Sequence, residues 1–350
     1  MKLNIFRKFS NRKTKDPGLR LDMAERAINL PNQYFKDFVE SLSQEDFLCY
    51  PSESEYHDLK RDLSKLENIS PQNISLGFGS DQIIKNIFHL YAQKNSKAIY
   101  NLPSFPMYKV YADTFGLISK TIEYNVSLDF SIDQMLKQID NKASLVVLAN
   151  PNSPFGSIKG LRDIRALCVE LKKYDGALLL DEAYIDFGGR TSAQLVSVFD
   201  NLIICKTFSK AWGAAGARFG YAIANPSVID NLEKLRPSFP LTGVTIKYIK
   251  FLIEHNHIKE QYVQSIIEER NILKKSPLNK NFDIKYGDVS WVHINDKEDN
   301  IFLDKLLKSN KISYKNRLVL PHDSRENWIR LGLKQGITGF LENENFINRG

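Results

Sequence analysis

The sequence predicts an α/β protein with a large, doubly wound, mostly parallel sheet and a smaller α+β domain. Four short runs rich in Val, Ile and Leu are typical of parallel strands that are buried on both faces: residues 144–150, 177–181, 201–205 and 218–224. Between the first two runs, apolar residues recur every three or four positions over 161–171. This spacing indicates a helix that crosses over the sheet.

A change of pattern after Pro240 predicts two domains. We expect residues 36–240 to form the large α/β domain, and residues 1–35 and 241–350 to form the small one. In the large domain, a glycine-rich segment at 77–80 leads into a short helix at 81–91. In the small domain we expect a helical stretch at 243–274, a strand at 289–293, a helix at 298–309, and strands at 312–318 and 328–333. The first thirty or so residues are expected to dock on the small domain.

Composition excludes several classes of protein. Of the 350 residues, 43% are hydrophobic and 25% are charged, which is ordinary for a globular protein and excludes wholesale disorder. No apolar run approaches the roughly 18 residues that a membrane-spanning helix needs. Cys49, Cys168 and Cys205 are scattered and odd in number, so we expect no disulfide framework or zinc ribbon, and a reducing, cytoplasmic location.

The net charge of +7 is concentrated at the N-terminus. Residues 1–20 contain seven Lys or Arg and one Asp, so the rest of the chain is almost neutral and carries no stripe for binding nucleic acid. This basic segment lacks the apolar core of a secretory signal. We expect a solvated terminus, with a targeting segment or a contact arm as the alternatives. The six histidines are scattered and predict no metal site.

Four polar segments stand where the expected strands end, which is where ligands bind in open α/β sheets. They are residues 77–82 (GFGSDQ), 150–156 (NPNSPFG), 181–184 (DEAY) and 207–210 (TFSK). An aldehyde cofactor with a pyridine ring and a phosphate would use all four. Such a cofactor needs an amine for a Schiff base, a carboxylate for its ring nitrogen and a phosphate cradle.

Lys210 is the candidate amine and general base, because it follows a strand in a segment of small residues that lets a ring approach. Asp181 ends an apolar strand, where an unpaired carboxylate is costly, so a pyridinium nitrogen is a fitting partner. Taken alone, Lys210 would be a surface lysine and Asp181 a capping residue. Their occurrence together favours the chemical role.

The remaining candidates surround the phosphate and the ring. Gly79, Ser80 and Asp81 would present backbone N–H groups at a helix start, although a plain helix cap is the alternative. The hydroxyls of Thr207 and Ser209 and the guanidinium of Arg218 would donate to the phosphate. Tyr184 and Asn152 (or Ser153) would donate to the phenolic oxygen of the cofactor. The Tyr108 ring would stack on the cofactor or, alternatively, be a core aromatic.

Together these motifs resemble fold type I pyridoxal-phosphate enzymes, specifically the histidinol-phosphate aminotransferase-like branch of class I and II aminotransferases. The resemblance covers about residues 19–333 and rests on six motifs in order: Tyr50-Pro51, Gly79-Ser80-Asp81, Met107-Tyr108, Asp181-Glu182-Ala183-Tyr184, Thr207-Phe208-Ser209-Lys210 with Arg218, and Ile329-Arg330-Leu331-Gly332. It implies pyridoxal 5'-phosphate as cofactor and a homodimer with shared sites, in which Tyr50 reaches the neighbouring subunit's phosphate. It also implies that Arg330 binds an acidic substrate group.

Two segments depart from the family pattern. The usual Asn-Pro-Asn-Asn-Pro-Thr-Gly is 150–156 here, with Ser153 and Phe155 in place of Asn and Thr. The expected Asp-x-Asn-Glu-Asn-Pro is 22–27 here, with Glu25 and Arg26 as candidate substrate-binding residues. Because that loop lines the family's substrate pocket, its change argues against histidinol phosphate. The family's second substrate-binding arginine corresponds to Lys315 or Arg317 in this sequence.

The sequence thus predicts an aminotransferase that moves an amino group, from glutamate, to a small keto or aldehyde acceptor that can carry a phosphate. The first alternative is a decarboxylase of a phosphorylated amino acid such as threonine or serine phosphate, since the same branch contains such enzymes. The second is a binding or regulatory protein that keeps the fold without turnover, against which Lys210 and Asp181 argue. Small-molecule substrates and a second copy of the chain are the expected partners, with no nucleic acid and no membrane.

Overall fold

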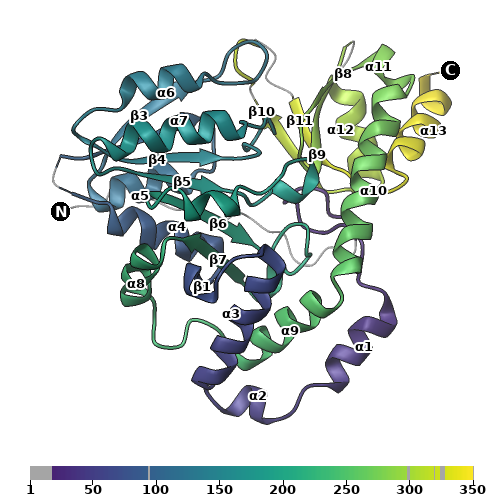
Figure 1. Ribbon diagram of the computed structural model, residues 1–350. Helices are drawn as coiled ribbons and strands as arrows, with labels where there is room; N and C mark the ends of the chain where they lie inside the picture. The colour runs from purple at the N-terminus through teal and green to yellow at the C-terminus, as the bar shows by residue number, and fades with distance from the viewer. Residues whose placement is uncertain (1–17, 94, 298–299, 319, 324–327, 350) are drawn as a thin grey trace.

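A computed structural model describes residues 18–93, 95–297, 300–318, 320–323 and 328–349. The backbone forms a seven-stranded sheet and a four-stranded sheet, which we call the large and the small sheet. Helices flank both (Figure 1). The basic N-terminal residues 1–17 lie outside the described part of the chain.

The large sheet has the strand order β1-β7-β6-β5-β4-β2-β3. Strands β2 to β6 are parallel to their neighbours in this group, which confirms the expected mostly parallel sheet. The strands are β1 (Ile74–Phe78), β2 (Lys97–Leu102), β3 (Ile118–Glu123), β4 (Ala143–Ala149), β5 (Ala177–Asp181), β6 (Leu202–Thr207) and β7 (Phe219–Ala224). All seven residues of β4 and all five of β5 are buried, as their near-continuous apolar sequence predicts.

Strand β7 differs from the expectation of parallel strands, because it is antiparallel to both β6 and β1. The segment between Thr207 and Phe219 contains only a short 3-10 turn at Ala215–Ala217 and no crossover helix. A parallel connection would need a crossover of a dozen or more residues, usually with a helix. The chain therefore reverses direction after β6, and residues 208–218 form the loop that leads into β7.

Helices cover both faces of the large sheet. One apolar cluster joins the sheet to α3 (Glu53–Glu67), α6 (Ile132–Gln138), α7 (Leu161–Lys172) and α9 (Gly243–Glu254). A second cluster joins the opposite face to α4 (Gly79–Leu90), α5 (Met107–Phe115) and α8 (Pro226–Leu235). The expected crossover helix at 161–171 is confirmed as α7, which buries Ile164, Leu167, Cys168 and Leu171.

The small sheet is antiparallel in the order β10-β11-β9-β8. Its strands are β8 (Phe282–Tyr286), β9 (Trp291–Asp296), β10 (Lys315–Leu318) and β11 (Trp328–Gly332), and its helices are α10 (Asn256–Lys275), α11 (Leu278–Asn281), α12 (Asn300–Ser309) and α13 (Ile337–Arg349). The expected single helical stretch at 243–274 is broken at His255, which separates α9 from α10. Strand β8 was not expected, although Phe282, Ile284 and Tyr286 alternate on its core side.

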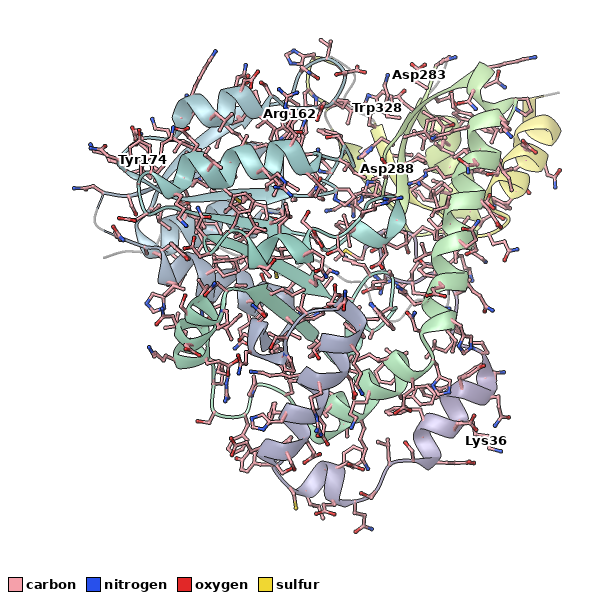
Figure 2. All side chains as sticks on the ribbon, in the orientation of Figure 1. Lys36, Arg162, Tyr174, Asp283, Asp288 and Trp328 are labelled. Atoms are coloured by element: carbon pink, nitrogen blue, oxygen red, sulfur yellow. The ribbon has the colours of Figure 1, made fainter. Side chains whose placement is uncertain are left out.

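The two faces of the small sheet meet different partners. One face packs on α10, α12 and α13 through Val292, Ile294 and Leu331. From the other face, Trp328 joins the apolar cluster of the large sheet (Figure 2). The small sheet is thereby held against the large one.

Residues 19–21 of the N-terminal segment dock on the small sheet. The backbone N–H of Leu21 donates to Ser313, and the N–H of Gly332 donates to Leu21. Leu21 is buried in the small-sheet core. Helices α1 (Asn32–Glu40) and α2 (Glu45–Leu48) then run beside α9, where Phe38 contacts Tyr248 and Phe251 (Figure 1).

Candidate active site

The carboxyl ends of β4, β5 and β6 meet at one edge of the large sheet. Asp181 ends β5, residues 150–156 follow β4, and the loop after β6 carries Lys210. Because these strands are parallel, the four polar segments expected to act together do converge, with the start of α4 brought in beside β7.

Asp181 is a buried carboxylate with specific donors. The Tyr108 hydroxyl donates to its Oδ2 at 2.6 Å, and the N–H of Ala183 donates to its Oδ1 at 3.1 Å. Burial raises the pKa of Asp181, while the two hydrogen bonds and the charge of Lys210 act in the opposite direction. The side chain is 7% exposed, so a cationic ring nitrogen would find a carboxylate screened from water.

Lys210 is held by the N-terminal segment. Its Nζ donates to the carbonyl oxygen of Met23 at 3.2 Å and lies 5.3 Å from the centre of the Tyr184 ring. The Tyr184 ring in turn packs edge-on against Trp291 of β9 at 4.7 Å. The candidate amine of Lys210 therefore lies between the two sheets, beside the Tyr184 ring, which was expected to donate to the phenolic oxygen of the cofactor.

Two close backbone approaches form a cradle at the start of α4. A Cβ atom on Gly220 would lie 2.7 Å from the carbonyl carbon of Gly79 and closer still to the amide nitrogen of Ser80. A Cβ on Gly79 would lie 2.8 Å from Nη2 of Arg218, and Gly79 has a positive φ of 76°. Glycine is therefore favoured at position 220 by the close backbone and at position 79 by the backbone conformation. The backbone donors of the helix start and the Arg218 guanidinium come together, as an anion site requires.

The other expected phosphate residues surround this cradle. Thr207 is buried and its Oγ1 accepts from the N–H of Ser209 at 3.1 Å. Ser209 is 9% exposed. Asp81 accepts a hydrogen bond from Tyr111 at 2.8 Å. The first contact orders the turn between β6 and Lys210, and the second joins the first turn of α4 to α5.

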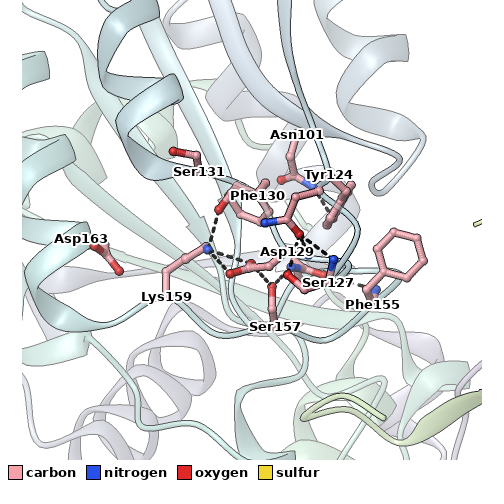
Figure 3. A network of polar contacts seen from close by, with 12 residues as sticks. Asn101, Tyr124, Ser127, Asp129, Phe130, Ser131, Phe155, Ser157, Lys159 and Asp163 are labelled. Atoms are coloured by element: carbon pink, nitrogen blue, oxygen red, sulfur yellow. Dashed lines mark hydrogen bonds and ion pairs between the residues drawn. The ribbon is translucent and has the colours of Figure 1, made fainter. Parts of the chain in front are cut away.

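Asn152 holds its own loop together. Its Oδ1 accepts from the N–H groups of Phe155 and Gly156, and its Nδ2 donates to Ser157. Ser157 donates to Asp129 at 2.6 Å, and Lys159 contacts the same carboxylate at 2.7 Å (Figure 3). The contact of Asn152 with the cofactor stays a prediction, since its amide group is engaged in the turn.

Tyr108 also has a different surrounding from the one expected. Its ring is 1% exposed and packs at 5.6 Å on Phe105 and 6.4 Å on Phe88. The structure thus shows a core aromatic whose hydroxyl contacts Asp181. Stacking on the cofactor ring stays a prediction.

Arg330 lies on β11 of the small sheet. Its Nη2 donates to the carbonyl oxygen of Asp22 at 2.8 Å, and its guanidinium carbon lies 5.0 Å from the centre of the Trp291 ring. Burial lowers the pKa of Arg330, while Tyr184 and Asp22 oppose this. Its cross-strand neighbours are His293 on β9 and Lys315 on β10. The Lys315 alternative for the second cation is thus placed beside Arg330, whereas the Arg317 side chain lies outside the described part of the chain.

The structure does not bring every candidate to one place. Glu25 lies 3.9 Å from Arg20, and Arg26 lies over the Tyr262 ring at 4.7 Å. Tyr50 is 76% exposed and stacks on Phe239 at 4.2 Å. The roles of Glu25, Arg26 and Tyr50 in substrate or cofactor binding stay predictions.

A buried ionic cluster behind the site was missed from the sequence. Lys206 donates to Glu67 at 2.7 Å and lies 3.8 Å from Glu182, while Tyr221 donates to Glu67 at 2.5 Å. Burial alone would lower the pKa of Lys206, but Glu182 and Glu67 reverse this and raise it. Lys206 and Glu182 directly precede and follow Thr207 and Asp181, so the cluster fixes the strand ends that carry the site. A lysine inside an apolar strand was the signal in the sequence.

Within residues 18–349, as far as they are described, no three His, Cys, Asp or Glu side chains gather as metal ligands would. In the same residues no helix has the length and apolar character to cross a membrane.

Comparisons with known proteins agree with this geometry. The family model for aminotransferase class I and II matches residues 21–334. The histidinol-phosphate aminotransferase of Christiangramia forsetii is 31% identical over 322 residues, which cover 89% of this chain and 90% of the relative. That of Thermoanaerobacter sp. (strain X514) is 28% identical over 328 residues, covering 90% and 92%. The crystal structure of histidinol-phosphate aminotransferase from Sinorhizobium meliloti in complex with pyridoxal-5'-phosphate superposes with a TM-score of 0.77, covering 90% of this chain and 86% of that one at 22% identity.

The residues present fit pyridoxal phosphate. The carboxylate of Asp181 is buried and would meet the ring nitrogen, Lys210 would supply the amine, and the glycine cradle beside Arg218 leaves room that any Cβ would fill. The expected fold type I architecture and cofactor are therefore confirmed, and the protein is a pyridoxal-phosphate-dependent enzyme. The chain belongs to the aminotransferase class I and II family.

Proposed function

We propose that the enzyme transfers an amino group from glutamate to a small keto or aldehyde acceptor that carries a phosphate. One observation carries this proposal: the carbonyl oxygens of two adjacent residues in one loop accept hydrogen bonds from Arg330 and Lys210. Asp22 accepts from Arg330 at 2.8 Å, and Met23 accepts from Lys210 at 3.2 Å. A donor whose carboxylate binds the guanidinium would thus present its α-carbon to the amine.

Some residues of the site would bind the cofactor, and others would transfer protons. Pyridoxal phosphate, when bound, supplies an electron sink for the bonds of the substrate α-carbon. Asp181 would keep the ring nitrogen protonated, and Tyr184 would donate to the phenolic oxygen. Lys210 would move the proton at the substrate α-carbon. Gly79, Ser80, Asp81, Thr207, Ser209 and Arg218 would hold the phosphate, with Tyr108 and Asn152 supporting the ring.

The names of the relatives favour a phosphorylated substrate, since those proteins are histidinol-phosphate aminotransferases. The loop at 22–27 nevertheless differs from the family pattern in its side chains, while its backbone carries the contacts to Lys210 and Arg330. We therefore favour a small phosphorylated acceptor other than histidinol phosphate.

A homodimer with shared sites belongs to this proposal. Large apolar side chains are exposed along α1, α2 and the following turn: Phe35 (56%), Val39 (47%), Phe47 (69%), Leu48 (78%) and Tyr50 (76%). Such a contiguous set favours an interface. Tyr50 would reach the phosphate of the second subunit. The proposal also includes a cytoplasmic location and two domains, a large one of residues 36–240 and a small one of residues 1–35 with 241–350.

The test is to mix the loaded enzyme with L-glutamate and record the cofactor absorbance. Transamination predicts conversion to the pyridoxamine form, reversed by the acceptor, and no conversion in Lys210→Ala. Lys172→Met, which removes an exposed lysine, is the control. Absence of conversion, together with release of CO2 from threonine or serine phosphate, would replace the proposal with the decarboxylase alternative.

A further inference from the structure

Arg26 is a cation whose hydrogen-bond donors are buried and unused. Its Nε and Nη1 atoms have no partner among the residues that the structure describes. The guanidinium carbon lies 4.7 Å from the centre of the Tyr262 ring. The Tyr262 hydroxyl accepts a hydrogen bond from the backbone of Ala27, so the ring below Arg26 is fixed. Buried donors of a charged group without acceptors are costly, which indicates an acceptor that the protein itself does not provide.

The backbone makes room for this arginine. Gly213 has a positive φ of 73°, and a Cβ there would lie 2.5 Å from Cδ of Arg26. The N–H of Gly213 donates to the carbonyl oxygen of Lys210 at 3.0 Å, which closes a tight turn directly after the reactive lysine. Arg26 is thus placed against the turn that carries Lys210.

Arg26 opens on a cavity of about 420 Å3. Its lining includes Arg26, Asn29, Asn32, Phe35, Gly213 and Tyr248. Among the lining residues given by the structure, Arg26 is the one with a charge, so the cavity favours an anion. The amides of Asn29 and Asn32 and the phenol of Tyr248 can bond hydroxyl or carbonyl groups of the same ligand.

The cavity and Arg330 have different surroundings. Arg330 contacts Asp22 and Trp291, whereas Arg26 contacts Gly213 and Tyr262. Two residues separate Arg26 from Met23, whose carbonyl contacts Lys210, and Gly213, which lines the cavity, donates to the carbonyl oxygen of Lys210. A substrate that reacts at Lys210 can therefore extend into it.

We propose, on the basis of the transamination proposed above, that this cavity binds the distal end of the acceptor and that Arg26 binds its terminal phosphate or carboxylate. The site would be distinct from the anion site of Arg330. The acceptor class is then a short polar chain with a keto or aldehyde group at one end and an anion at the other. Because the cavity exceeds the size of a phosphate, it would also hold part of the hydroxylated body.

The experiment compares matched acceptors in wild-type enzyme, Arg26→Gln, Arg26→Lys and a control, Lys36→Gln. Lys36 is an exposed cation on α1 that does not line the cavity (Figure 2). The phosphate arm uses keto and aldehyde sugars of three to six carbons with and without a terminal phosphate. The carboxylate arm compares 4-oxobutanoate, an aldehyde with a terminal carboxylate, with butanal, because 2-oxoglutarate is the product of the donor L-glutamate and would report on the donor site. Cofactor conversion by L-glutamate reports in each variant whether the protein is folded and loaded.

We expect Arg26→Gln to lower kcat/KM at least about tenfold for the phosphorylated or the carboxylated member of each pair, mainly through KM, because a charge-assisted hydrogen bond is lost. The uncharged member should change less than about threefold, so the preference for the anion falls. Arg26→Lys should restore part of that preference, and Lys36→Gln should leave it intact. The arm that responds identifies phosphate or carboxylate.

An equal loss for both members of a pair, or an unchanged preference in Arg26→Gln, would overturn the assignment. So would an enzyme that converts with L-glutamate but accepts no anionic acceptor in either arm. Failure of L-glutamate to convert the wild-type cofactor is a separate result, which contradicts the proposed transamination itself.

Discussion

The hydroxyl of Tyr108 donates a 2.6 Å hydrogen bond to Oδ2 of Asp181, and both side chains are buried at the carboxyl edge of the large sheet. Burial raises the pKa of Asp181, and the hydrogen bond from Tyr108 counteracts this by favouring the carboxylate. Tyr108 thereby supports the charge that a cofactor ring nitrogen would need.

Replacing Tyr108 with Phe should weaken cofactor binding, because Asp181 loses the donor that stabilises its charged form. We expect the Kd for pyridoxal phosphate to rise about tenfold or more, since hydrogen bonds to charged groups contribute about 1.5–3 kcal/mol. Titration of the cofactor-free protein by absorbance measures this. Tyr100→Phe is the control, because Tyr100 is also buried but donates to Ser119. Equal Kd values for Tyr108→Phe and wild type would contradict the prediction.

The cradle at the start of α4 predicts that Gly220→Ala loses cofactor affinity. The added Cβ would lie 2.7 Å from the carbonyl carbon of Gly79, so the two segments must separate and the backbone donors move. We expect a higher Kd for pyridoxal phosphate, with a fall in the melting temperature of the loaded enzyme. Gly339→Ala, on α13 with open space around its Cβ, should leave the Kd unchanged. The prediction is wrong if both variants bind the cofactor alike.

The ionic cluster behind the site predicts that Lys206→Met is strongly destabilising. The substitution leaves Glu67 and Glu182 buried without their cation, and breaking a buried pair costs about 3–5 kcal/mol. Urea unfolding should show this loss in the free energy of unfolding. Adding Glu67→Gln should recover part of it, because one unpaired charge is removed. Lys172→Met, on the surface, should change the stability by less than about 1 kcal/mol.

His293 predicts a pH-dependent stability. Burial, followed by the charge of Arg330, lowers its pKa from 6.5 to about 3, so the folded protein keeps the imidazole neutral. Below pH 6.5 the unfolded chain binds a proton that the folded one does not. Stability is therefore full above this pH and is lost as the pH falls towards 3, by up to about 1.4 kcal/mol per pH unit.

The measurement is the free energy of unfolding in urea at several pH values. His293→Gln should flatten the slope between pH 6.5 and 3, whereas His57→Gln, at an exposed histidine of α3, should leave it as in the wild type. A slope that is the same in His293→Gln and wild type would exclude His293 as its source.

Parts of the site could be predicted because they depend on local sequence. Asp181 ends one apolar strand and Lys210 follows the next. Parallel strands have their carboxyl ends at one edge of the sheet, so the two residues were expected to lie together. The antiparallel course of β7 could not be expected from its apolar residues, because composition does not fix strand direction. Trp291, which joins Tyr184 to Arg330, gave no signal either, since its partners come from other elements.

The α/β class and the family could be inferred from the sequence alone, because periodicity and spaced motifs are properties of neighbouring positions. The contacts of one loop with both Lys210 and Arg330, through the carbonyls of Met23 and Asp22, and the place of Arg26 over Tyr262 depend instead on tertiary packing. These are contacts between residues as many as 308 positions apart. They exist because burial of Leu21 in the small-sheet core brings the N-terminal segment across both sheets.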